Sequence, residues 1–153
     1  MIVFIGCGAT KMKTACKARK MYVGNYVQLC LAYAQTFTTL DNIYILSAKY
    51  GVLPLEKVIE PYNKTLNNMN IEEKQDWKNM VIKQLEEMNI NKDTEVVFIC
   101  GTNYYTLLED YFTNYKLPLP KQGIGVQQHF MLEELREYNK THSPKILMNN
   151  LLR

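Results

Sequence analysis

Acidic side chains are absent from the first forty residues, which carry five basic ones, Lys11, Lys13, Lys17, Arg19 and Lys20. The whole chain has 18 Lys and Arg against 15 Asp and Glu, so this segment holds a charge of +5 and the remainder holds −2. A net charge of +3 is too small by itself to indicate nucleic-acid binding. Because the positive charge is concentrated in one segment, it predicts an anionic partner for that segment.

Close pairs of metal ligands are also missing. The four cysteines include no C-x-x-C pair, and the two histidines lie far from them in sequence. Zinc sites usually show such close pairs, so the sequence predicts no metal site. Free thiols are the default for an intracellular protein.

Long hydrophobic runs are absent as well. No window reaches the roughly 18 uncharged apolar residues that a membrane span needs, and the N-terminal apolar run is too short for a secretion signal. With 47% hydrophobic and 22% charged residues, the chain has the composition of a folded globular protein. We therefore expect a soluble, cytoplasmic protein with no membrane partner.

Four common enzyme motifs do not occur. The sequence has no G-x-x-x-x-G-K-[ST], no G-x-G-x-x-G after a strand, no H-E-x-x-H and no G-x-S-x-G. A P-loop triphosphatase, a standard dinucleotide enzyme, a zincin and an α/β hydrolase are all disfavoured. No cofactor is predicted.

Short apolar runs predict buried strands at residues 1–5, 42–46 and 95–99. Apolar residues spaced three and four apart predict helices over about 18–37, 77–88 and 104–115. Asn70 and Glu73 resemble a capping pair before the second helix. This order predicts one α/β domain over residues 1–153, with a three-layer, mainly parallel, Rossmann-like sheet and flanking helices.

The remainder of the chain is predicted to be helical. Two prolines in 117–120 exclude a central strand or a helix interior there. Gly123 and Gly125 open a fourth helix that runs to about residue 138. Ser143 and Pro144 then predict a short final helix over 145–152.

Three loops follow the predicted strands, at residues 6–11, 47–51 and 100–104. In an open α/β sheet these loops meet at the carboxyl edge, where ligands bind. Each loop contains a glycine, which lets backbone N–H groups approach a ligand closely. The sequence therefore predicts one site built from all three loops, and Asn103 belongs to it.

Cys7 is the most specific single candidate for a functional residue, and two interpretations of it stay open. A thiol between two glycines near Lys11 could act as a nucleophile, or it could be the last buried residue of the strand. Lys11 and Lys49 could hold phosphates or, if desolvated, act as reactive amines. Arg19 opens a helix, where an anionic partner such as a phosphate would relieve its conflict with the helix dipole.

Two later segments add candidates. Glu60 could activate water or stabilise a cationic sugar, and Tyr62 could stack on a base, although the same residues also fit an ordinary turn. Gln127 could read the edge of a base, although glutamine is also common at the start of a helix. His129 is interpreted as a residue of a helix face.

Several motifs together resemble a known family. They are Cys7-Gly8-x-x-Lys11, Ala18-Arg19-x-x-Tyr22-x-Gly24, the run Leu46-Ser47-Ala48-Lys49-Tyr50-Gly51-Val52-Leu53, and Ile59-x-Pro61-Tyr62-x-x-Thr65-Leu66, with Gly123-x-Gly125-x-Gln127 at the tail. They resemble an uncharacterised domain family of bacteria and their phages. That family is distantly similar to the YaaA peroxide-stress proteins and to the accessory domain of archaeosine-type tRNA transglycosylases and synthases.

The resemblance implies an α/β domain associated with DNA or modified nucleobases. It implies site membership for Cys7, Lys11, Arg19, Tyr22, Ser47, Lys49, Tyr50, Pro61 and Tyr62. The chain is short and lacks the additional helical DNA-binding elements expected of full-length YaaA-like proteins.

The first functional hypothesis is a glycosylase-like enzyme that cleaves or exchanges the N-glycosidic bond of an extruded, modified base in DNA, with DNA rather than RNA as its partner. Lys11 and Arg19 would hold flanking phosphates. Tyr22 or Tyr62 would stack on the base, whose edge Ser47 and Gln127 would bind. Lys49 or Glu60 would assist at the sugar, and Cys7 would shape the pocket or attack. The alternatives are a non-catalytic DNA-binding module of the YaaA type and an enzyme acting on a small nucleotide or sugar phosphate.

Overall fold

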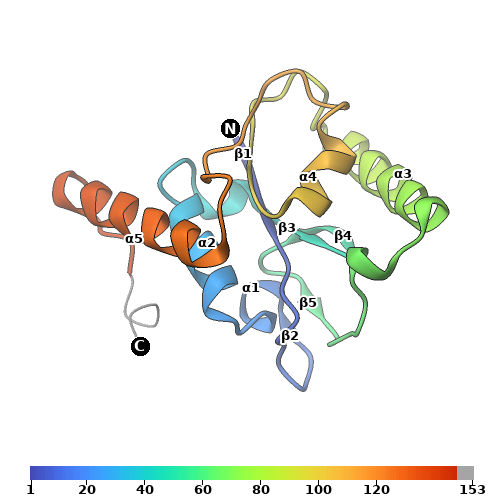
Figure 1. Ribbon diagram of the computed structural model, residues 1–153, viewed down its shortest axis with the longest axis horizontal. Helices are drawn as coiled ribbons and strands as arrows, with labels where there is room; N and C mark the ends of the chain where they lie inside the picture. The colour runs from blue at the N-terminus through green and yellow to red at the C-terminus, as the bar shows by residue number, and fades with distance from the viewer. Residues whose placement is uncertain (148–153) are drawn as a thin grey trace.

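The computed structural model describes residues 1–147 and is built around a five-stranded sheet (Figure 1). Its strands are β1 (Ile2–Gly6), β3 (Ile43–Ser47), β4 (Gly51–Pro54), β6 (Val96–Ile99) and β7 (Tyr115–Lys116), in the spatial order β4-β3-β1-β6-β7. All neighbouring pairs are parallel except β3 with β4. The three predicted strands are confirmed as its central members, and their apolar side chains are buried.

Helices cover both faces of this sheet, which gives three layers (Figure 1). One face carries α1 (Ala18–Met21), α2 (Asn25–Ala34) and α5 (Ile124–Thr141), and the other carries α3 (Ile71–Glu87) and α4 (Thr102–Leu108). The mainly parallel α/β fold predicted from the sequence is therefore confirmed. No helix within residues 1–147 is long and apolar enough to cross a membrane.

Short elements complete the fold. A two-stranded antiparallel ribbon joins β2 (Cys16–Lys17) to β5 (Val58–Ile59). Two 3-10 turns are η1 (Leu40–Asn42) and η2 (Leu66–Asn68). The predicted capping pair is confirmed, because the Asn70 side chain accepts the Glu73 N–H while the Glu73 carboxylate accepts the Asn70 N–H.

Three predicted helices differ from the structure. The helix expected over 18–37 is two helices, because the chain leaves helical geometry at Tyr22 and pairs there with Lys11. The helix expected over 104–115 ends at Leu108. Tyr115 is instead part of strand β7, where it pairs with Val96 of β6. In the helix expected over 145–152, residues 145–147 are not helical and the others lie outside the described residues.

The turn between β3 and β4 depends on Gly51, whose φ is +72°. Its position is fixed by the Gln84 amide of α3, which donates to the Tyr50 carbonyl at 2.9 Å and accepts the Val52 N–H at 2.8 Å. A Cβ at position 51 would lie only 2.2 Å from the Gln84 Oε1. Glycine is therefore required here, and the turn holds the end of β3 in place.

The sheet order reverses between β1 and β6. The chain leaves β1 for β3 over the face covered by α2, whereas it reaches β6 from β3 over the face covered by α3 (Figure 1). The loops after β1 and β6 consequently turn to opposite sides. Open α/β sheets bind ligands in the crevice that such a reversal leaves at the carboxyl ends of the strands.

Candidate functional site

Three hydroxyl groups are linked in a row at the carboxyl edge of the sheet. The Ser47 hydroxyl lies 2.7 Å from the Tyr62 hydroxyl, which lies 2.7 Å from the Tyr22 hydroxyl. We call Ser47, Tyr62 and Tyr22 the hydroxyl chain. The Ser47 oxygen already accepts the N–H groups of Lys49 and Tyr50, at 3.3 and 3.0 Å. Ser47 therefore donates its own proton to Tyr62, and Tyr62 donates to Tyr22.

The hydroxyl chain is anchored by a buried serine. Apart from tyrosines, Ser47 is the one polar side chain that is fully buried within residues 1–147. Its carbonyl accepts the Trp77 indole N–H at 2.9 Å, so α3 fixes its backbone. The hydroxyl and the carbonyl of Ser47 thus both have hydrogen-bond partners, as buried polar groups require.

A thiol lies beside the hydroxyl chain at the point where the sheet order reverses. The Cys7 sulfur is 2.8 Å from the Tyr104 hydroxyl, so this contact joins the loop after β1 to α4. Cys7 is partly buried and packs against both hydrophobic cores. Next to it, a Cβ at Gly8 would lie 2.9 Å from Val27, which shows how closely the loop approaches α2.

The phenol groups of this edge are protonated at neutral pH. Burial raises the pKa of Tyr22 to about 12. Burial, followed by the nearby Cys7 sulfur, also raises the pKa values of Tyr62 and Tyr104. These tyrosines therefore act as hydrogen-bond donors at neutral pH and not as bases.

Lys11 brings a positive charge to the hydroxyl chain, whereas Lys49 does not. The Lys11 ammonium lies 4.6 Å from the ring centroid of Tyr62 and 5.9 Å from that of Tyr22. A cation over an aromatic face at these distances is attracted by the ring. Lys49 is exposed, and its ammonium lies 5.2 Å from the ring centroid of Tyr50, outside the chain of hydroxyls.

Arg19 lies in a different cluster. Its Nε is 3.2 Å from a carboxylate oxygen of Glu56, and the Lys17 ammonium is 2.7 Å from the other. Hydrogen bonding to Lys17, together with the charge of Arg19, lowers the pKa of Glu56. The sequence predicts an anionic partner for Arg19, and in the structure the Glu56 carboxylate of the same chain is that partner.

Of three other predicted site residues, Tyr50 contacts the hydroxyl chain, whereas Glu60 and Asn103 are hydrogen-bonded to other residues. Tyr50 packs edge-on against Tyr62, with ring centroids 5.6 Å apart, and its hydroxyl donates to the Glu60 carbonyl at 3.4 Å. The Glu60 carboxylate is exposed and has no hydrogen bond or ion pair to residues 1–147. Asn103 donates to the Asn67 side chain at 2.7 Å, which ties α4 to η2.

Gln127 serves a structural role in this conformation. Its amide oxygen accepts the Tyr26 hydroxyl, and its amide nitrogen donates to the Pro120 carbonyl at 3.1 Å. These bonds tie the loop before α5 to α2. The same residue lines a cavity of about 580 Å³ between α4, residues 117–123 and the start of α5.

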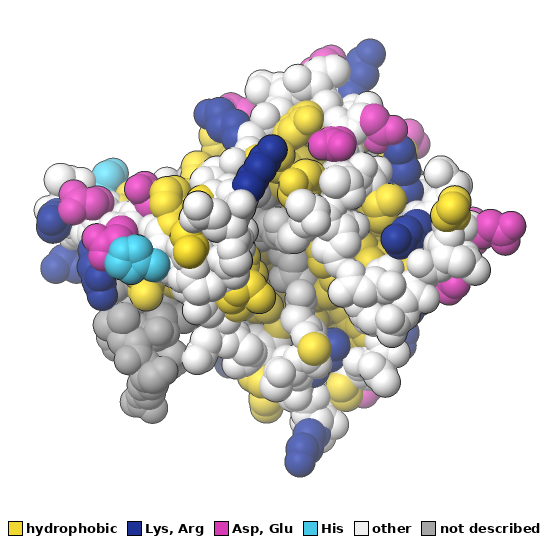
Figure 2. Space-filling model, in the orientation of Figure 1, with side chains coloured by type: hydrophobic (Ala, Val, Ile, Leu, Met, Phe, Trp, Pro, Cys, Tyr) yellow, Lys and Arg dark blue, Asp and Glu magenta, His cyan; other side chains and the backbone are white. Residues whose placement is uncertain are grey.

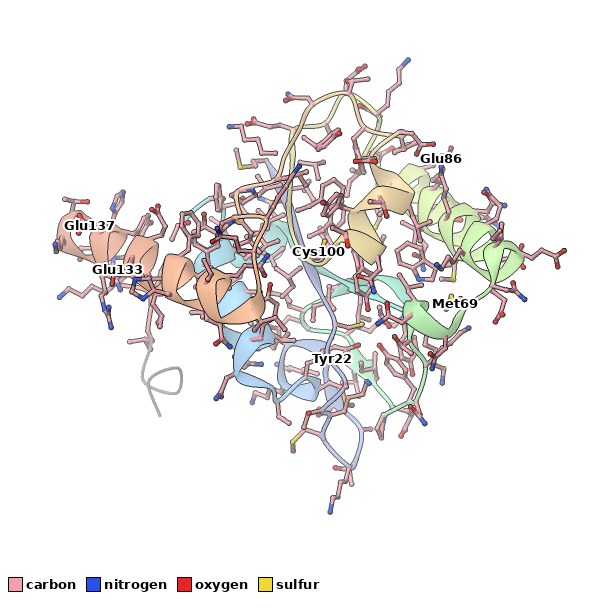
Figure 3. All side chains as sticks on the ribbon, viewed as in Figure 1. Tyr22, Met69, Glu86, Cys100, Glu133 and Glu137 are labelled. Atoms are coloured by element: carbon pink, nitrogen blue, oxygen red, sulfur yellow. The ribbon has the colours of Figure 1, made fainter. Side chains whose placement is uncertain are left out.

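The cavity opens on one face of the molecule. Figure 2 shows a hollow between α4 and α5 whose visible walls are mostly hydrophobic or uncharged. Cys100 lines it at the end of β6, and Figure 3 shows this residue between the two helices, with Tyr22 nearer the end of β1. Cys7 does not line it, so the thiol and the cavity are separate features of the same edge.

Sequence reasoning missed two contributors to the edge. Tyr104 lies in the predicted loop 100–104, but the sequence does not single it out among the site residues. Trp77 gave no signal, because its role depends on α3 crossing behind β3. The structure brings Cys7, Lys11, Tyr22, Ser47 and Tyr62 to one edge of the sheet, and their roles in a site stay predictions.

The chain belongs to DUF6884, a family of unknown function, whose model matches residues 2–133. The match includes the hydroxyl chain, Cys7, Tyr104 and the whole lining of the cavity. The chain matches no curated protein. The resemblance to YaaA and archaeosine-type domains stays a prediction.

Proposed function

We propose that this chain is an enzyme that processes a nucleobase in DNA, cleaving or exchanging the N-glycosidic bond of a modified base. The observation that carries the proposal is the Cys7 sulfur, held 2.8 Å from the protonated Tyr104 hydroxyl where the sheet order reverses. A partly buried thiol beside hydrogen-bond donors, at the usual ligand edge of an α/β sheet, fits a nucleophile better than a core residue.

The chemistry assigns complementary tasks to the groups present. The Cys7 thiol gives its proton to solvent, and the thiolate then attacks C1′ of the sugar and forms a C–S bond. The base leaves with the electrons of the broken C1′–N bond and takes up a proton from solvent. Tyr104 donates a hydrogen bond to the sulfur while it is negatively charged. Water then displaces the sugar from sulfur in hydrolysis, and a second base does so in exchange.

Lys11 and the hydroxyl chain would position the substrate. Lys11 carries the positive charge of the edge, which suits a phosphate next to the reacting sugar. Tyr62 is partly exposed and is held by Ser47, so it offers a fixed aromatic and polar surface. Lys49 and Glu60 are exposed at the outside of the edge, where they would act only on a substrate that extends beyond it.

A small nucleotide is the second candidate substrate, and the cavity favours it. A space of about 580 Å³ is the size of a typical small-molecule pocket. Binding of DNA would instead rely on exposed lysines such as Lys13 and Lys20, which have no ion pair within residues 1–147. Comparison of oligonucleotides with free nucleotides separates the two substrates.

The test is incubation with oligonucleotides and free nucleotides that contain ordinary or modified bases, scored for released base and for abasic sites. We expect release by the natural chain and a loss of more than about 100-fold in Cys7→Ala. Thr10→Ala, an exposed change in the same loop, serves as the control. If no base is released from any substrate and Cys7→Ala binds DNA like the natural chain, the protein is a binding module instead.

A further inference from the structure

The cavity between α4 and α5 has the walls of a site for a flat, largely apolar group. Phe98 and Tyr105 supply aromatic rings, and Leu117, Leu119 and Ile124 supply aliphatic surface. Ile124 is 60% exposed at the start of α5, an unusual position for a large apolar side chain. A planar ring in the cavity would cover this surface.

Polar groups of the cavity are available to a ligand. The Thr102 hydroxyl and the Gln122 side-chain amide line it, and neither has a hydrogen-bond partner within residues 1–147. Lys121 adds one positive charge, and no acidic residue lines the cavity. Gln127 differs, because both ends of its amide are engaged by Tyr26 and Pro120. It therefore builds the wall, while Gln122 is available for recognition.

The cavity also lies next to the proposed nucleophile. Cys100 and Gly101 line it directly after β6, and β6 pairs in parallel with β1, where Ile99 stands beside Ile5. The chain then reaches Cys7 two residues after Ile5. A ligand lying across the ends of these two strands would have one part in the cavity and another close to the thiol.

We propose that this cavity holds the base of the substrate, stacked against Tyr105 and hydrogen-bonded at its edge by Gln122. This inference rests on the proposed function, because it assigns the base to the cavity and the sugar to the edge that carries Cys7. Nucleobases combine a flat π-face with polar edges, and glutamine amides bind such edges through paired donor and acceptor groups. Lys121 lies where it can attract a phosphate of the same nucleotide.

The direct test is an NMR titration of the full chain with adenosine and thymidine monophosphates, in which the glycine amides report the position of the ligand. Gly101, Gly123 and Gly125 flank the cavity, and Gly24 and Gly51 lie elsewhere. We expect the first three signals to shift with saturation and the other two to stay fixed. Absence of saturable shifts with both nucleotides, or shifts confined to Gly24 and Gly51, would overturn the proposal.

Two variants separate this inference from the proposed reaction. Gln122→Ala removes the available amide from the loop before α5, and Gln128→Ala removes an amide from the first turns of α5 that does not line the cavity. For an active substrate we expect Gln122→Ala to raise KM about tenfold at unchanged kcat, and Gln128→Ala to change neither. An active enzyme that responds equally to both variants would refute the base site alone. Absence of activity together with the expected NMR shifts would refute the reaction alone.

Discussion

Two polar clusters draw on the same basic N-terminal segment, and they use its charges differently. Lys17 and Arg19 share the single carboxylate of Glu56 in a partly exposed ion-pair cluster, where its negative charge offsets part of their positive charge. Lys11 instead lies over the tyrosines of the hydroxyl chain, which are neutral and protonated. The comparison shows that a run of basic residues does not mark one binding surface. Of these two clusters, the one whose cation faces no carboxylate within residues 1–147 indicates where an anionic ligand would bind.

The two clusters also differ in what holds them. Exposed ion pairs contribute little to stability, because water and salt screen them. A buried hydrogen-bond chain costs much more to break, since each abandoned partner stays away from water. Ser47, Tyr62 and Tyr22 should therefore determine the stability of the carboxyl edge, whereas Glu56 should have little influence.

The largest expected effect is loss of stability at high pH. The pKa of Tyr22 is about 12 in the folded protein and near 10 when the chain unfolds, so the unfolded state loses its proton first. The contribution of Tyr22 to the free energy of unfolding is therefore fully present below pH 10. It falls between about pH 10 and 12, by roughly 3 kcal/mol for this residue alone. Urea unfolding across this range should show a shallower decline for Tyr22→Phe. An identical decline in both proteins would contradict the burial of this phenol.

The next effect is that of Ser47→Ala. The change leaves the Lys49 and Tyr50 N–H groups without their acceptor and deprives Tyr62 of a donor. We expect a loss of about 2 kcal/mol in the free energy of unfolding, measured with urea at neutral pH. Thr10→Ala removes an exposed hydroxyl and is the matched control. Equal stability of the two variants would show that the hydroxyl chain does not hold the edge.

The smallest effect is expected for Glu56→Gln, which removes the charge that Lys17 and Arg19 share. Its stability should differ from that of the natural chain less than that of Ser47→Ala does. The difference should shrink in about 1 M salt, where the Debye length falls to about 3 Å. Thermal melts at low and high salt measure it. A larger loss than in Ser47→Ala would reverse the comparison.

The central fold was predictable because its strands are short, apolar and fully buried. β1, β3 and β6 therefore stand out in the sequence, whereas the four-residue β4 and the two-residue β7 do not. The break between α1 and α2 was hidden as well, since the apolar spacing continues through Tyr22. It arises from the pairing of Tyr22 with Lys11, a contact that local periodicity cannot show.

The candidate site was predictable to the extent that it follows from the strand ends. Parallel strands bring their following loops to one edge, which places Cys7 and Ser47 together without further information. The directions in which the long polar side chains point were not predictable from the sequence. Arg19 turns to Glu56, and Gln127 turns to Tyr26, because the nearest partner in the folded chain decides where a long polar side chain goes.

The most direct test of the account compares Cys7→Ser with Glu56→Gln for base release from the best substrate found among modified oligonucleotides and nucleotides. Both variants should stay folded, as near-natural melting temperatures would show. We predict that Cys7→Ser releases base more than about 100-fold more slowly than the natural chain, while Glu56→Gln releases it at the natural rate. Release at the natural rate by Cys7→Ser would contradict the claim that chemistry takes place at the carboxyl edge through this thiol.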